Sequence, residues 1–237
     1  MSAAREPLPP RAWIPNLVTA ANIAVGFVSM LVAADGRYEL AVYLLLVCFF
    51  LDMGDGRLAR RLHATSALGQ QLDSFCDLLS FGAAPAFLLY RSILSELGPV
   101  GGAVCLLYLL AGLYRLARFN LTSDPHAKAR RTTGVPIPIG AGYLMVTVLM
   151  RDELQPVWAA VVALVMAIAM VSRWRLPDLK GRGLVSALLV VNILNYVAVV
   201  IWPGWPTVAW WQLWTVLILL AARREDRRFT ESAPLPS

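Results

Sequence analysis

Long apolar runs alternate along the chain with short polar segments that are rich in charged residues. A helix needs about 20 residues to cross the hydrocarbon core of a bilayer, and several of the runs have about this length. The runs cover residues 13–33, 38–54, 73–93, 98–114, 135–150, 155–172, 184–202 and 207–222. The pattern predicts an all-α membrane protein, a bundle of about eight transmembrane helices.

Some of these runs are interrupted by Gly and Pro, which weaken helical hydrogen bonding. Gly82 and Pro85 lie in the third run. Gly134, Pro136 and Pro138 lie at the start of the fifth. Such residues are tolerated within a membrane when neighbouring helices cover the backbone groups that they leave free. Apolar length alone therefore leaves seven spans as an alternative to eight.

The composition excludes an average soluble domain. The 237 residues are 58% hydrophobic and 15% charged, with a mean hydropathy of +0.62, and eight spans leave no room for a large soluble domain. The three Cys residues show no C-x-x-C spacing, and the chain has only two His residues. Neither a disulfide framework nor a zinc cluster is supported.

The basic residues gather on one side of this arrangement. With the N-terminus in the cytoplasm, 18 of the 21 Lys and Arg residues fall at cytoplasmic positions, and only Arg37, Arg91 and Arg151 fall outside. The positive-inside rule then predicts an even number of spans with both termini in the cytoplasm, and removing one span would destroy the alternation. The net charge of +6 is accordingly explained by loops that face anionic lipid, without a nucleic acid partner.

The chain divides into a cytoplasmic N-terminal segment, a membrane domain and a cytoplasmic tail, residues 1–12, 13–222 and 223–237. No small-residue cleavage site follows the first apolar run, so a removed signal peptide is not expected. The tail is strongly basic and then rich in Pro and Ser, which predicts a disordered end with a basic patch at the membrane surface.

Four aspartates lie together at the cytoplasmic end of the second and third spans. Asp52 and Asp55 are spaced i,i+3, and Asp73 and Asp77 are spaced i,i+4. Each pair therefore projects from one face of its helix. Because the connection between the two helices is short, the two faces can meet, and the four carboxylates are expected to converge.

An acidic cluster at the edge of hydrocarbon is a candidate functional site, because buried carboxylates need cations beside them. Arg57, Arg60 and Arg61 could supply these cations, but Arg57 is i+2 from Asp55 and would point away from it. Oxygen ligands without His or Cys favour Mg²⁺ or Mn²⁺, which usually complete their coordination with water and substrate phosphates. The cluster therefore predicts a divalent metal site and a phosphate-bearing substrate.

Small residues accompany these aspartates, namely Gly54, Gly56, Ala59 and Gly69. They let another group approach the backbone closely, as a nucleotide base or a pyrophosphate requires. Taken singly, such residues are also common where membrane helices pack together. Their spacing relative to the aspartates therefore carries the argument.

The whole stretch resembles the signature of the CDP-alcohol phosphatidyltransferases, with all eight fixed positions present: Asp52, Asp55, Gly56, Ala59, Arg60, Gly69, Asp73 and Asp77. The resemblance implies a helical membrane enzyme in which an alcohol attacks a CDP-linked lipid and releases CMP. It implies that the four aspartates hold two divalent ions, Mg²⁺ or Mn²⁺, and that Asp77 is also the base for the incoming hydroxyl. The nucleotide-binding positions that it implies are Asn16, Thr19, Asp55, Gly56, Ala59, Arg60 and Gly69.

Further stretches resemble the branch of the family that uses L-serine as acceptor: residues 15–22, 73–86, 115–120 and 134–138. Phe75 and Cys76 depart from the smaller pair expected in that branch. The resemblance implies CDP-diacylglycerol and L-serine as substrates and phosphatidylserine and CMP as products. It also implies a homodimer in a prokaryotic cell (inner) membrane, with the active site facing the cytoplasm.

Serine carries a carboxylate, and the planar guanidinium of arginine can bind a carboxylate through two parallel hydrogen bonds. Arg115 and Arg118 are the candidates for this contact, although basic residues that flank a span serve topology as well. Other acceptors remain open, namely glycerol 3-phosphate, an inositol phosphate, choline and ethanolamine. A cation-coupled transporter is a further alternative, but it gives no reason for the small-residue spacing or for acids at one end of the spans.

Overall fold

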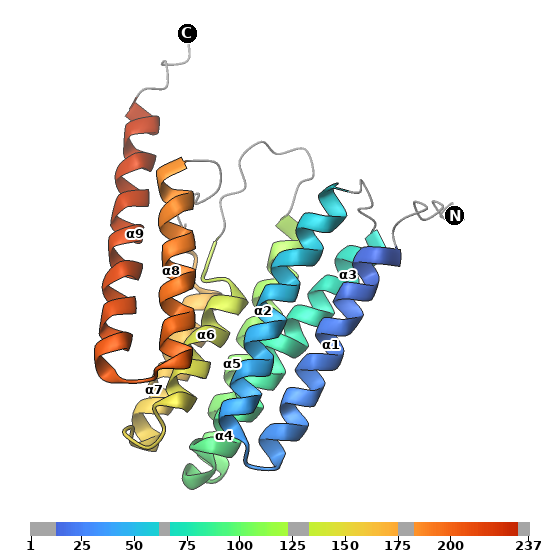
Figure 1. The fold of residues 1–237 in the computed structure, drawn as a ribbon, viewed down its shortest axis with the longest axis vertical. Coiled ribbons are helices and arrows are strands. Elements are labelled where there is room, and N and C mark those ends of the chain that lie inside the picture. Colours follow the sequence, from blue (N-terminus) through green and yellow to red (C-terminus); the bar gives the residue numbers. More distant parts are fainter. Residues whose placement is uncertain (1–12, 62–66, 123–132, 175–182, 232–237) are drawn as a thin grey trace.

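The computed structural model describes residues 13–61, 67–122, 133–174 and 183–231, which form a bundle of helices lying roughly side by side (Figure 1). The elements are α1 (Trp13–Ala34), α2 (Tyr38–Arg61), α3 (Ala67–Asp77), the π-helix η1 (Leu78–Ala83), α4 (Ala84–Ser92), the 3₁₀-helix η2 (Leu94–Leu97), α5 (Pro99–Thr122), α6 (Ile137–Leu149), α7 (Pro156–Val171), α8 (Gly183–Ile201) and α9 (Trp205–Glu231). No β-strand occurs in these ranges. The prediction of an all-α membrane bundle is confirmed.

Each of the eight predicted apolar runs corresponds to one helical rod, and the third rod is built from α3, η1 and α4 joined end to end. Three segments are long and apolar enough to cross a membrane by length and composition, Trp13–Ala34, Leu68–Ser92 and Pro99–Leu121. Shorter apolar helices cover Ile137–Leu149, Pro156–Val171, Leu188–Ile201 and Trp205–Leu220. The rods alternate in direction, so the start of α1 and the end of α9 lie at the same end of the bundle (Figure 1).

The structure corrects the predicted start of disorder at residue 223, because α9 continues to Glu231. The Arg and Glu residues that follow the apolar part of α9 have high helix propensity, so the helix can extend beyond the membrane-spanning length. Within the tail, Pro and Ser occur only in residues 232–237, which lie outside the described ranges.

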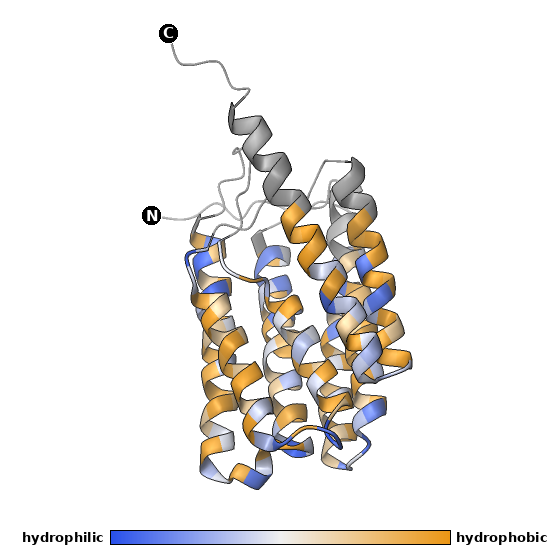
Figure 2. Cartoon of the chain, turned by 90° about the vertical axis from the view of Figure 1, so that its left-hand side faces the viewer, coloured by the Kyte–Doolittle hydropathy of each residue, from blue (hydrophilic) through white to orange (hydrophobic). Residues whose placement is uncertain are grey.

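The outside of the bundle is apolar as well as the inside. Leu45, Leu88 and Leu144 are completely enclosed, whereas Ile168 on α7 is 70% exposed. Figure 2 shows apolar residues along most of the length of the helices. An exterior of this kind suits a lipid environment, since a soluble protein rarely exposes so large an apolar surface.

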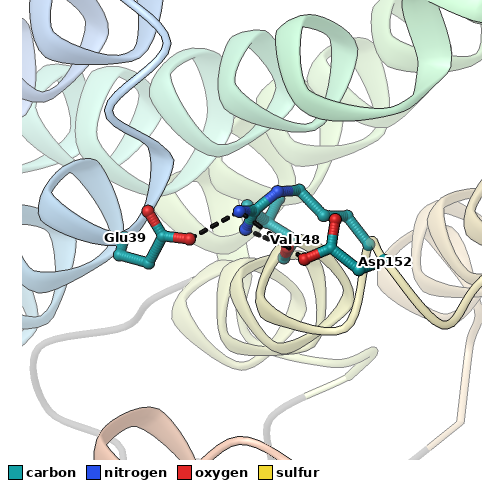
Figure 3. A network of polar contacts seen from close by, with 4 residues as sticks. Glu39, Val148 and Asp152 are labelled. Carbon is teal, nitrogen blue, oxygen red and sulfur yellow. Dashed lines mark hydrogen bonds and ion pairs between the residues drawn. The ribbon is translucent and has the colours of Figure 1, made fainter.

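Two of the three basic residues that are predicted to lie outside the cytoplasm, Arg151 and Arg91, make polar contacts at the end of the bundle opposite the start of α1. Arg151 forms an ion pair with Glu39 at 2.6 Å, lies 3.8 Å from Asp152, and donates to the carbonyl of Val148 at 3.3 Å (Figure 3). Arg91 donates from Nη2 to the carbonyl of Ala34 at the end of α1, over 3.1 Å. These contacts explain why the positive-inside pattern tolerates the two residues.

The π-helix η1 follows from the sequence around Pro85. In a regular helix the carbonyl of Phe81 would accept the N–H of residue 85, but proline has no N–H and its ring clashes with that carbonyl. The backbone widens instead, and the N–H of Ala84 bonds to the carbonyl of Leu79, five residues back. The hydroxyl of Tyr108 on α5 donates to the Phe81 carbonyl at 3.0 Å. A neighbouring helix thus covers the backbone group that proline leaves free, as predicted for this run.

Candidate functional site

The aspartates lie where α2 and α3 approach the end of the bundle at which α1 begins (Figure 1). Asp52 and Asp55 are on α2, and Asp73 and Asp77 are on α3. The Asp77 carboxylate interacts electrostatically with both Asp52 and Asp73, and the Asp52 carboxyl group is within hydrogen-bond reach of it. The structure therefore brings three of the four predicted carboxylates together, while the side chain of Asp55 is outside the described part.

One oxygen of the Asp77 carboxylate lacks a hydrogen-bond partner in the part of the chain that the structure describes. Oδ1 is buried and has no hydrogen-bond partner among the described residues. A buried carboxylate oxygen without a partner is unfavourable, and neighbouring like charges add to the cost. A cation beside this oxygen would relieve both effects.

The donor set suits a hard divalent cation, because it consists of carboxylate oxygens without His or Cys ligands. Among the side chains that the structure describes, no three His, Cys, Asp or Glu residues form a group that could hold a metal ion. Asp55, expected to be a ligand, is not among those side chains. The unpartnered oxygen of Asp77 fits an ion, and the full ligand set stays a prediction.

Arg115 on α5 is the basic side chain that interacts electrostatically with Asp77. It is only 7% exposed, its Nε is buried without a partner in the described part, and its guanidinium lies 5.3 Å from the ring centre of Phe119. A buried arginine with an unused donor next to a carboxylate cluster can bind an anionic group. Binding of the serine carboxylate by Arg115 stays a prediction.

Arg118 faces another part of the protein. Its Nη1 donates to the carbonyl of Val171 at 2.9 Å, and its Nη2 donates to those of Thr133 at 3.0 Å, Ser172 at 3.1 Å and Met170 at 3.3 Å. The last carbonyls of a helix have no helical donors, so Arg118 satisfies the C-terminal end of α7. This geometry favours a structural role for Arg118, whereas Arg115, three residues earlier on α5, interacts with Asp77.

Gly134 completes the same structural unit. Its N–H donates to the carbonyl of Trp174 at 2.9 Å, and its φ of 75° is a backbone conformation that glycine adopts readily. A Cβ at this position would collide with the carbonyl of Met170 and with the guanidinium of Arg118. The predicted motif at 134–138 therefore anchors the start of α6 against the end of α7.

The predicted nucleotide-binding positions lie on three helices that border the aspartates. Asn16 on α1 is half-buried, and the Thr19 hydroxyl donates to the carbonyl of Pro15 at 3.1 Å. Gly69 is in the first turn of α3. Gly56, Ala59 and Arg60 are in the helical part of α2, and their surroundings lie outside the described part.

A polar network below the aspartates was not assigned from the sequence. Asn22 on α1 donates from Nδ2 to the carbonyl of Cys48 on α2 at 3.1 Å, and Ser80 in η1 donates to Asn22 Oδ1 at 3.0 Å. Closer to the site, Asn120 Nδ2 donates to Ser74 Oγ at 2.9 Å and links α5 to α3. The sequence feature that could have indicated this network is the presence of polar residues within apolar spans, since such residues usually face the bundle interior.

The chain matches the family model of the CDP-alcohol phosphatidyltransferases over residues 12–174. A Helicobacter pylori (strain ATCC 700392 / 26695) protein named CDP-diacylglycerol–serine O-phosphatidyltransferase is 36% identical over 150 residues, 62% of each chain. A Bacillus subtilis (strain 168) protein of the same name is 32% identical over 171 residues, 72% of this chain and 93% of that one. The archaetidylserine synthase of Methanothermobacter thermautotrophicus is 29% identical over 176 residues, 73% of each. The match thus spans less than two thirds of the length of the Helicobacter relative.

Proposed function

Because this chain belongs to the CDP-alcohol phosphatidyltransferase family, we propose that it transfers the phosphatidyl group of CDP-diacylglycerol to the hydroxyl of L-serine. The observation that carries the proposal is the unpartnered Asp77 oxygen, which lies beside Asp52 and Asp73 and faces Arg115. The names of the relatives support serine as the acceptor. The products are phosphatidylserine and CMP.

The bond changes assign a task to Asp77. The serine oxygen bonds to the phosphorus that carries diacylglycerol, the pyrophosphate bond to CMP breaks, and the serine hydroxyl loses its proton. Asp77 accepts that proton, since Oδ1 has no partner among the described residues and has lone pairs for both an ion and the incoming hydroxyl. Burial of the site among α2, α3 and α5 limits competition from water, which would otherwise hydrolyse the donor.

The donor lipid carries a pyrophosphate, whose negative charge must be neutralised beside several carboxylates. Asp52, Asp55, Asp73 and Asp77 would hold two divalent ions, Mg²⁺ or Mn²⁺, which supply neutralising charge and polarise the phosphoryl group. Arg60 on α2 would contribute a further positive charge toward the phosphates. The cytidine portion would lie against the small positions Gly56, Ala59 and Gly69 and the polar side chains of Asn16 and Thr19.

The site faces the cytoplasm in this proposal. The aspartates lie near the end of the bundle where α1 begins and α9 ends (Figure 1). The helix ends on that side carry several basic residues, among them Arg60, Arg115, Arg118 and Arg223, as the positive-inside rule requires for the cytoplasmic side. A prokaryotic inner membrane and a homodimeric assembly complete the proposal, both from the family resemblance.

The reaction is tested with purified protein in detergent, labelled CDP-diacylglycerol and a series of alcohols. We expect release of CMP and a new lipid with L-serine, and little product with glycerol 3-phosphate, an inositol phosphate, choline or ethanolamine. Efficient use of ethanolamine would exclude recognition of the serine carboxylate. Absence of CMP release with every alcohol, together with cation uptake into vesicles, would favour a transporter instead.

The contrast between the two arginines gives a prediction on the acceptor. Arg115→Lys keeps a positive charge but removes the planar pair of donors, so the KM for serine should rise by about 10- to 100-fold, the effect of losing one strong charge-assisted contact. The KM for CDP-diacylglycerol should change little. Steady-state kinetics with each substrate varied in turn measures both constants.

Arg118→Lys is the matched control, since it makes the same change three residues away. Its guanidinium donates to four backbone carbonyls, so this variant should lower thermal stability and leave the serine KM unchanged. A raised serine KM in Arg118→Lys and an unchanged one in Arg115→Lys would reverse the assignment.

A further inference from the structure

The rod that carries Asp73 and Asp77 changes its helical geometry directly after the second aspartate. The α-helix α3 ends at Asp77, and the π-helix η1 starts at Leu78. A π-turn contains more residues than an α-turn and thus rotates the residues after it relative to those before it. The direction of the Asp77 side chain relative to the rest of the rod therefore depends on η1 keeping this geometry.

Two buried hydrogen bonds hold η1 from opposite sides. Ser80 donates to Asn22 Oδ1 on α1 at 3.0 Å, and Phe81 accepts the Tyr108 hydroxyl of α5 at 3.0 Å. The side chains of Ser80, Asn22 and Tyr108 have no exposed surface. The helices α1 and η1 are also closely packed here, because a Cβ on Gly26 of α1 would lie 2.7 Å from Ser80 Oγ.

Asn22 reaches the second aspartate-bearing helix through the same side chain. Its Nδ2 donates at 3.1 Å to the carbonyl of Cys48 on α2. In an α-helix this carbonyl also accepts the N–H of the residue four positions later, which is Asp52. One buried amide therefore connects the turn of α2 that leads to Asp52 with the π-helix that follows Asp77.

We propose that Tyr108, Ser80 and Asn22 are positioning residues for the phosphatidyl transfer, an inference that rests on the proposed function. They touch neither substrate in this proposal. They fix the backbone around Asp77, whose Oδ1 has no partner among the described residues to orient it. Displacement of a reacting group by about 1 Å can lower a rate about 100-fold, so the backbone support matters for turnover more than for substrate binding.

Tyr108→Phe tests the proposal, because it removes one hydroxyl and leaves the ring. We expect kcat to fall by about 10- to 100-fold, while the KM values for CDP-diacylglycerol and serine stay within about twofold. The matched control is Tyr196→Phe. Tyr196 is also buried, and its hydroxyl donates to the Gly142 carbonyl and to Met145 Sδ, both at 3.4 Å, on helix α6, which carries none of the aspartates.

Tyr196→Phe should keep the kcat of the wild type. If its melting temperature is close to that of Tyr108→Phe, the lower kcat of Tyr108→Phe comes from the positioning of Asp77 and not from a loss of overall stability. Ser80→Ala removes the bond on the opposite side of η1 and should give the same kinetic pattern as Tyr108→Phe. Equal kcat values for wild type, Tyr108→Phe and Ser80→Ala would overturn the inference and leave the proposed function standing. A wild-type protein that releases no CMP would overturn both.

Discussion

Asp77→Asn is expected to lower turnover by about 10²- to 10⁴-fold, the usual contribution of a positioned general base. The amide keeps the size of the side chain but cannot accept a proton from serine under these conditions. Asp77 Oδ1 is buried beside Asp52 and Asp73 and has no partner among the described side chains, so the substitution also reduces the local repulsion. Binding of CDP-diacylglycerol should consequently be retained in large part, and single-turnover kinetics with a separate binding assay measures the two effects.

Asp52→Asn and Asp73→Asn are the matched comparisons, because they make the same chemical change at neighbouring positions. Both should weaken the binding of nucleotide and metal as well as turnover, since these residues are proposed as ligands and not as the base. A general base affects the chemical step alone, whereas a ligand affects binding too. The same loss of CDP-diacylglycerol binding in all three variants would reduce Asp77 to a metal ligand like the other two and would leave the base unassigned.

The helical rods of the fold were predictable from the sequence because each depends on one local property, the length of its apolar run. An apolar run of sufficient length must be helical in lipid, since its backbone groups have no other partners there. Helix ends were less predictable, as α2 and α5 run on to Arg61 and Thr122. At the membrane boundary the apolar pattern stops, while the backbone hydrogen bonds of a helix continue at little cost.

The candidate site was predictable to the extent that it depends on spacing along one helix. The i,i+3 and i,i+4 pairs placed Asp52, Asp73 and Asp77 on faces that the structure brings together. Spacing could not separate Arg115 from Arg118, because both lie on one side of α5 and differ only in what packs against that side. That difference arises from α7, which is about 50 residues away in the sequence and contributes the carbonyl of Val171.

The π-helix shows a similar limit. Pro85 indicated that a backbone carbonyl would be left free, and the expectation that a neighbouring helix covers it is correct. The sequence did not indicate that Tyr108 supplies the donor, since any polar side chain on an adjacent helix could do so. Partners between helices depend on tertiary packing, which a local pattern does not encode.

Removal of divalent metal is expected to abolish transfer, and Mg²⁺ or Mn²⁺ should restore it. The physical reason is charge: a pyrophosphate must enter a site in which Asp77 already lies beside Asp52 and Asp73, with Arg115 as a nearby positive charge. Arg115 and the proposed Arg60 carry two positive charges, which cannot offset these carboxylates and the pyrophosphate together, whereas two divalent ions add four more. Assays before and after chelation, with each ion added back, measure the effect on CMP release.

A second measurement separates metal binding at the aspartates from a general salt effect. An ion that binds only the folded protein and is present at a concentration of about 100 times its Kd stabilises the protein by about 2.7 kcal/mol. Mg²⁺ or Mn²⁺ should therefore raise the melting temperature of the wild type. The rise should be smaller in Asp52→Asn, which removes a proposed ligand. Glu39→Gln is the matched control, because the Glu39 carboxylate pairs with Arg151 at 2.6 Å at the opposite end of the bundle. The metal should raise the melting temperature of this variant as much as that of the wild type. Full activity in excess chelator, or equal thermal shifts in all three proteins, would contradict the assignment of the metal to the aspartate cluster.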